Sequence, residues 1–101
     1  MFLPIAALWI FLDDSHQRGI EFYHQKKYLE AIEILEEAAK SEGEKTAEYK
    51  ESVLLIGKSY FMLAQAPKSI PWLEKLPEST EASYMLGYAY LQTRQQQWPV
   101  K

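Results

Sequence analysis

A glycine followed three positions later by an aromatic residue occurs three times in this chain, and this feature constrains the fold most. The three pairs are Gly19 with Phe22, Gly57 with Tyr60, and Gly87 with Tyr90. Within a helix a glycine lowers stability by about 1 kcal/mol relative to alanine, so its repeated use indicates that close helix packing requires it. Because residues three apart share a helix face, each pair presents a notch beside a large ring. The intervals of 38 and 30 residues indicate stacked helical units rather than one closed globule.

Composition removes several classes of function. The 101 residues carry a net charge of −3, which gives no clustered basic surface for nucleic acid. The absence of cysteine excludes disulfides, thiol catalysis and cysteine-based zinc sites. No glycine-rich phosphate loop or metal-binding motif is present. The acidic and hydroxyl residues just before His16 contain the ingredients of a triad, but helix capping explains them more simply. We expect no catalytic residue, no metal and no cofactor.

Residues 1–12 differ in kind from the rest of the chain because they are almost entirely apolar. The run is shorter than the roughly 20 residues that a helix needs to cross a bilayer, but its length suits the apolar centre of a secretory signal. No basic residue precedes it, and no clear cleavage site follows it. Two interpretations stay open: a signal segment of an exported or periplasmic protein, or a packed helical cap on a cytoplasmic one. We treat 1–12 as a separate segment and 13–101 as a helical repeat domain.

Apolar spacing after residue 12 is helical, and no segment shows the period-two alternation of a strand, so an all-α fold of about five helices is expected. Capping residues, glycines and prolines set the expected helix limits. The first helix is expected to begin at Asp13–Ser15, the second at Tyr28 with its end before Gly43, the third to run from Thr46 to about Ala64, the fourth from near Ser69 to Leu76, and the fifth from Glu78–Thr80 to about Gln95.

This pattern resembles the tetratricopeptide repeat family, in which antiparallel helix pairs of about 34 residues stack into a right-handed α-solenoid. About two and a half repeats are covered, from residue 12 to residue 95. The family tryptophan of the first helix is absent from all three units, with Ser15, Val53 and Ser83 in its place. The resemblance implies that the following residues pack the repeats together: Gly19, Phe22, Tyr28, Ala31, Leu35 and Ala38 in the first unit, Gly57, Tyr60 and Leu73 in the second, and Gly87 and Tyr90 in the third.

Members of the family mostly bind peptides or partner helices along a concave face lined by the first helix of each pair. The resemblance therefore implies a protein–protein interaction scaffold or adaptor without catalysis. Its implied partner-binding residues are Tyr23, His24, Leu54, Lys58, Phe61, Tyr84, Tyr88 and Leu91. The alternative for this lining is that its rings simply pack between units. Chaperone acidic tails are not expected as partners, because the positions of the family's cationic clamp hold His16, Ile20, Leu55, Glu81 and Met85.

The last expected helix is apolar around nearly its whole circumference, which is typical of a helix buried on all sides. The ten residues after Leu91 are too polar and too short to supply a covering helix. Either a second copy or another protein covers this surface, or the sequence is the N-terminal part of a longer array. A further alternative is that Trp98 and Pro99 fold back over part of the surface. A structural accessory subunit of an envelope or secretion assembly is the alternative function, and it depends on the role of residues 1–12.

Overall fold

The computed structural model describes the backbone of residues 5–97 and the side chains of residues 15–95. Five helices make up this part of the chain, and it contains no strand, so the all-α expectation is confirmed. The helices are α1 (Ile5–His24), α2 (Tyr28–Ser41), α3 (Ala47–Met62), α4 (Ala66–Leu73) and α5 (Thr80–Gln97).

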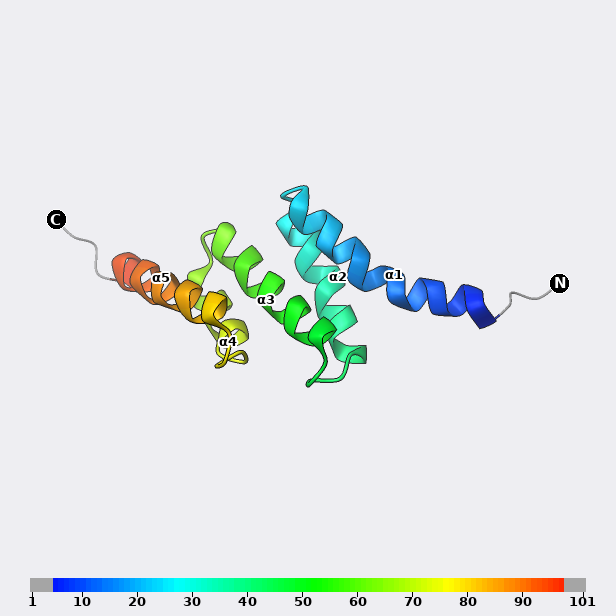
Figure 1. Cartoon of the computed structure of the whole chain (residues 1–101). Coiled ribbons are helices and arrows are strands. Elements are labelled where there is room, and N and C mark those ends of the chain that lie inside the picture. The colour runs from blue at the N-terminus through cyan, green and yellow to red at the C-terminus, as the bar shows by residue number, and fades with distance from the viewer. Residues whose placement is uncertain (1–4, 98–101) are drawn as a thin grey trace.

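The helices follow one another along an elongated molecule measuring 68 × 26 × 17 Å (Figure 1). Each helix packs on the next one in the chain. In addition, α1 contacts α3 and α3 contacts α5, so these three helices lie next to one another along one side. Figure 1 shows α1 at one end and α5 at the other, with the N-terminal half of α1 extending beyond the rest.

The same type of turn joins α1 to α2 and α3 to α4. The Lys27 amide donates to the carbonyl of Phe22 at 2.8 Å, and the Gln65 amide donates to the carbonyl of Tyr60 at 2.9 Å. The residue before each amide has a positive φ, 64° at Lys26 and 60° at Ala64. A left-handed residue followed by this six-residue hydrogen bond is the usual way to end a helix and reverse the chain. The carbonyl groups of Phe22 and Tyr60, the aromatic residues of the first two glycine pairs, therefore also take part in ending their helices.

Both glycine notches of these pairs are filled by a buried leucine. A Cβ atom added to Gly57 would lie 2.6 Å from Leu73 Cδ2, and one added to Gly19 would overlap Leu35. Leu35 and Leu73 have no exposed surface. Because glycine 19 pairs with residue 35 and glycine 57 with residue 73, the two pairs repeat at an interval of 38 residues. The close helix approach that the glycines indicated is thus present twice.

Two clusters of buried side chains form the core, and α3 belongs to both. One joins α2 to α3 through Ala31, Leu35 and Ile56, with side chains of α1 packed against it. The other joins α3, α4 and α5 through Val53, Leu73 and Ala82. The half-buried ring of Trp72 packs against both clusters and connects them.

Capping residues set the start of two helices as expected. Thr46 Oγ1 accepts a hydrogen bond from the Tyr49 amide at 3.1 Å at the start of α3. Ser79 Oγ accepts one from the Ala82 amide at 3.0 Å before α5. Each side chain satisfies an amide that has no partner inside the helix.

The expected limits of the fourth helix are wrong by three residues at each end. It begins at Ala66 rather than near Ser69 and ends at Leu73 rather than Leu76. Pro67 lies in the first turn, where a missing amide hydrogen is tolerated, so it does not delay the start of the helix. Pro71 lies inside the helix, which continues for only two more residues.

The expected start of the first helix is also wrong. The helix α1 begins at Ile5 and runs through Asp13 and Asp14, which therefore do not cap it. The residues before them include the strong helix formers Ala6, Ala7 and Leu8, and an interior aspartate costs less than 1 kcal/mol. Residues 1–12 were expected to form a signal segment or a packed cap. This expectation depends on residues 1–4 and on the side chains of residues 5–12, which lie outside the described part of the chain.

Gly57 and Gly87 provide a matched pair of substitutions. Gly57→Ala places a methyl group against the buried Leu73 side chain, and overpacking of this kind costs about 1–3 kcal/mol. We expect it to lower the free energy of unfolding in urea despite the gain in helix propensity. Gly87→Ala is the control, because a Cβ atom there meets nothing within 4 Å, and it is expected to raise stability by up to about 1 kcal/mol. Equal effects at the two positions would contradict the packing described for Gly57.

Candidate partner-binding face

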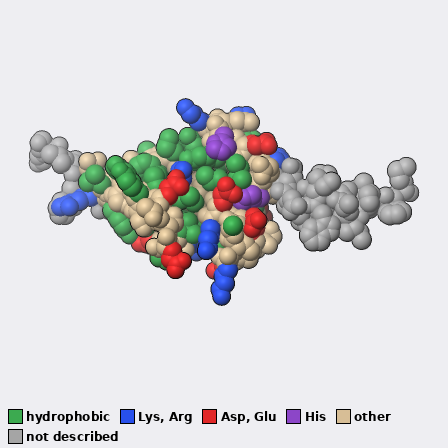
Figure 2. All heavy atoms as spheres, viewed as in Figure 1, with side chains coloured by type: hydrophobic (Ala, Val, Ile, Leu, Met, Phe, Trp, Pro, Cys, Tyr) green, Lys and Arg blue, Asp and Glu red, His purple; other side chains and the backbone are tan. Residues whose placement is uncertain are grey.

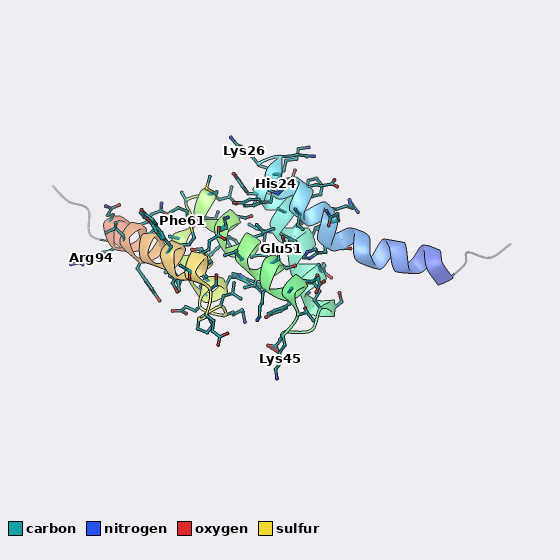
Figure 3. The ribbon with its side chains drawn as sticks, viewed as in Figure 1. His24, Lys26, Lys45, Glu51, Phe61 and Arg94 are labelled. Atoms are coloured by element: carbon teal, nitrogen blue, oxygen red, sulfur yellow. The ribbon has the colours of Figure 1, made fainter. Side chains whose placement is uncertain are left out.

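The expected partner-binding residues all lie on α1, α3 and α5, the three helices that adjoin along one side of the molecule. We call this side the first-helix face. Tyr23 and His24 are on α1, while Leu54, Lys58 and Phe61 are on α3. Tyr84, Tyr88 and Leu91 are on α5. Figure 3 shows Phe61 at the end of α3 nearer α5, and His24 at the far end of α1 beside the α1–α2 turn.

Large apolar side chains are exposed mainly at the α5 end of this face. Tyr84 is 65% exposed, Tyr88 is 49% exposed and Leu91 is 52% exposed. The rings of Tyr84 and Tyr88 stack with their centroids 5.3 Å apart, and a hydrogen bond with Tyr84 raises the pKa of Tyr88. Figure 2 shows hydrophobic side chains gathered over α5 and part of α3. Met62, at the end of α3, is also exposed and adds to the apolar surface.

The α1 and α3 part of the face is more closely packed. Tyr23, Leu54 and Phe61 are half-buried. Tyr23 and Leu54 each pack against one of the two core clusters, so part of each side chain stabilises the fold. The Tyr23 ring also meets the edges of the His24 and Tyr28 rings, with centroids 5.7 and 5.6 Å away. These side chains contribute surface to the face, and their contacts with the core and with neighbouring rings hold them in place.

Lys58 is the polar centre of the first-helix face. Its Nζ donates to Glu81 Oε2 of α5 at 2.7 Å and lies 5.5 Å from the centre of the Tyr23 ring of α1. Lys58 itself is on α3, so one ammonium group connects all three helices. Burial alone lowers the pKa of Lys58, but the hydrogen bond to Glu81 and the nearby Tyr23 and Glu81 groups outweigh it, and the net pKa is raised.

A polar cluster ties the middle of α1 to α2 and α3. The His16 Nδ1 atom lies 3.0 Å from Ser52 Oγ and 2.8 Å from Glu42 Oε2, while Nε2 lies 3.0 Å from Glu51 Oε1. Ser52 Oγ donates to Glu42 Oε1 at 2.9 Å. A histidine, a serine and a carboxylate in contact have the composition of a hydrolytic triad. Ser52 has no exposed surface, however, so its hydroxyl cannot reach a substrate, and the cluster connects three helices instead.

Sequence reasoning missed this cluster and placed His16 beside Asp13, Asp14 and Ser15 instead. Its true partners are 26 to 36 residues away, on α3 and directly after the end of α2. No spacing rule along one helix links them. A hint was available in the buried position of Ser52 within the apolar pattern of α3, since a buried hydroxyl needs a partner.

A cavity of about 740 Å³ opens beside the N-terminal half of α3. Its apolar lining includes Leu54, Leu76 and Pro77, and Lys50 and Glu51 are among its charged lining residues. The connection between α4 and α5 supplies Pro77 and its neighbours, and this contribution was not expected from sequence. Leu54 is thus an expected partner-binding residue that also lines this cavity.

The expected repeat-packing residues differ in burial between the units. Gly19, Ala31, Leu35, Ala38, Gly57 and Leu73 are buried, and Phe22, Tyr28 and Tyr60 are half-buried. Burial and the neighbouring Glu36 carboxylate raise the pKa of Tyr60. In the third unit Gly87 is exposed and Tyr90 is 50% exposed. The Tyr90 hydroxyl donates to Glu74, which attaches α5 to the end of α4.

No group of three or more histidine, aspartate or glutamate side chains in the described part of the chain is arranged to hold a metal ion. None of the described helices is long and apolar enough to cross a membrane.

Lys58→Met tests the connection between the three helices. The readout is how its effect on the free energy of unfolding depends on pH. The methionine keeps an apolar stem but removes the charge, so we expect a loss of up to about 1 kcal/mol at pH 8. Because the folded-state pKa of Lys58 is raised, its contribution is complete below the unfolded value of about 10.4 and is lost as pH rises through the folded value. The stability gap between the two proteins, measured by urea unfolding, is therefore expected to narrow at pH 11.

Lys45→Met is the control for this measurement, because Lys45 is exposed at the tip of the α2–α3 connection (Figure 3). It is expected to change stability little at either pH. A gap for Lys58→Met that stays constant between pH 8 and pH 11 would contradict a stabilising ammonium group at this position.

No family model matches the chain, and neither a curated protein nor a solved structure is significantly similar to it. The tetratricopeptide resemblance therefore stands on the glycine, aromatic and alanine positions of the sequence.

Proposed function

We propose that this protein is an interaction scaffold of the tetratricopeptide type, a right-handed array of helix pairs that binds a peptide or partner helix on its first-helix face. It carries out no chemistry of its own. The observation that carries the proposal is the set of exposed apolar side chains at one end of this face: Met62, Tyr84, Tyr88 and Leu91.

The distribution of exposed apolar surface supports this choice of face. On α2 and α4 the one large apolar side chain that is mostly exposed, among the described residues, is Leu29. The exposed tyrosines of α5 offer large, rigid contact area with a polar tip, a combination enriched at protein interfaces. A contiguous exposed patch of this kind on a protein surface usually marks an interaction site.

The charges on the face favour an apolar or amphipathic ligand over an acidic tail. Lys58 is already paired with Glu81, and its ammonium lies over the Tyr23 ring. Glu81 is more than half exposed and would repel a carboxylate. An amphipathic helix or extended segment with aromatic or aliphatic anchors is therefore the proposed ligand class.

The absence of chemistry is proposed on the same grounds. The cluster of His16, Ser52 and Glu42 is the arrangement closest to a catalytic constellation in the described chain, and its hydroxyl is inaccessible. Catalysis needs a nucleophile or base that a substrate can reach. A structural role for the cluster in joining three helices accounts for its geometry fully.

Selection from a displayed peptide library against the immobilised protein tests the proposal. We expect enriched peptides to share apolar anchors at helical or alternating spacing and to bind with micromolar affinity or better by fluorescence polarisation. Phe61→Ser should weaken binding at least tenfold, because Phe61 contributes a half-buried ring to the face. Leu29→Ser on α2 is the control and should leave binding unchanged.

Two results would contradict the proposal. One is the failure of any peptide to enrich against folded protein. The other is binding that Phe61→Ser leaves intact and Leu29→Ser removes, which would place the ligand on α2 instead. Circular dichroism of both variants keeps loss of binding separate from loss of fold.

A further inference from the structure

The third glycine notch of the chain is open. A Cβ atom added to Gly87 would have no neighbour within 4 Å, whereas at Gly57 it would lie 2.6 Å from a leucine. In both earlier pairs the leucine that fills the notch comes from the next helix, sixteen residues after the glycine. No helix follows α5 in the described residues. The contact that holds α1 to α2 and α3 to α4 is therefore missing at α5.

The surface around this notch is largely apolar, with Arg94 two turns after Gly87 on the same side of α5 and Glu74 hydrogen-bonded to Tyr90 at its edge. Tyr84, Tyr90 and Leu91 surround Gly87 on the helix and are 65%, 50% and 52% exposed. No charged residue occurs from Ser83 to Thr93. The opposite side of α5 is occupied, because Ala82 and Ala89 have no exposed surface and Ala82 belongs to the cluster shared with α3 and α4. We call the exposed side, centred on Gly87, the notch face of α5.

The notch face carries both a glycine and a leucine, the two residue types that form the missing contact. Leu91 follows Gly87 by four residues, so the two positions lie on the same side of the helix, one turn apart. In an antiparallel pair of α5 helices related by a two-fold axis near residue 89, Leu91 of each copy would lie opposite Gly87 of the other. One pairing would then form the glycine–leucine contact twice.

We infer that the protein forms a two-fold symmetric dimer in which α5 of one copy packs antiparallel on α5 of a second copy. The contact continues the packing that already joins the two internal helix pairs, which are also antiparallel. Residues 83–93 carry no charge, and the pairing places Arg94 of each copy opposite Tyr84 of the other, so like charges do not meet. Antiparallel helix dipoles add a small favourable term.

The size of the face sets the expected strength of the dimer. α5 has 18 residues, which corresponds to a length of about 27 Å. A single helix pair of this length buries less than the roughly 800 Å² per partner of a standard stable interface. A reversible, concentration-dependent dimer is therefore expected rather than a permanent one. The notch face adjoins the first-helix face and shares Tyr84 and Leu91 with it, so a bound peptide and the dimer would compete for these two side chains. The dimer is therefore tested without any peptide.

Sedimentation velocity over a concentration series from micromolar to millimolar, without any peptide, tests the dimer. The wild-type protein is expected to shift from monomer to dimer, and Leu91→Glu to weaken association at least tenfold by placing a charge in the interface. Leu29→Glu is the matched control, because Leu29 is an exposed leucine on α2, 64% exposed, and it should leave association unchanged. Circular dichroism of both variants checks that a loss of association is not a loss of helical structure.

The absence of cysteine makes the orientation measurable by cross-linking. Chains carrying Gly87→Cys and chains carrying Leu91→Cys are mixed and oxidised. Disulfides between unlike chains are expected to form faster than those between like chains, because residue 87 of one copy faces residue 91 of the other. Like positions are offset by four residues, about 6 Å along the helices. Gly87→Cys has room for its side chain, so it is expected to fold.

Three outcomes would overturn the inference. A monomer at every concentration would show that the notch face does not bind a second copy and serves another protein, a further segment of this chain or no helix at all. A dimer that tolerates Leu91→Glu would place the interface elsewhere. Faster cross-linking between two Gly87→Cys chains than between unlike chains would contradict the antiparallel register. None of these results depends on peptide binding, so the dimer and the proposed function can fail separately.

Discussion

The close approach of a leucine to a helix glycine is the contact on which the rest of this structure depends. At Gly57 there is no space for even a methyl group, because the Leu73 side chain occupies it. Gly19 and Leu35 repeat the arrangement 38 residues earlier. The cost of placing glycine inside a helix is thus offset by burying a complete leucine side chain at the crossing. Where the leucine is missing, at Gly87, the helix keeps an exposed apolar side, and the proposed dimer interface lies there.

Much of the local structure could be predicted from the sequence, because the signals lie within a few residues of one another. The glycine and aromatic pairs, the cap at Thr46 and the cap at Ser79 are short-range patterns, and each indicated its element correctly. The two errors in helix limits also have local causes. Pro67 was treated as a barrier although it lies in a first turn, and Asp13 was treated as a cap although a helix can continue through an aspartate.

The contacts between helices could not be predicted in the same way. The contact from Lys58 to Glu81, and those from His16 to Glu42 and Ser52, join residues 23 to 36 positions apart. Which charged side chains meet depends on how the helices are rotated against one another, and a single sequence carries no direct record of that. The same limit applies to the cavity beside Leu54, since half of its wall comes from the connection between α4 and α5.

Nuclear Overhauser effects between glycine α protons and leucine methyl groups test the glycine–leucine packing most directly. In a methyl-labelled sample studied at low concentration, strong effects are expected from Gly19 to Leu35 and from Gly57 to Leu73. None is expected from Gly87 to a methyl group outside α5. Absence of the first two effects, with the protein folded and helical, would contradict the packing on which the fold, the first-helix face and the dimer all depend.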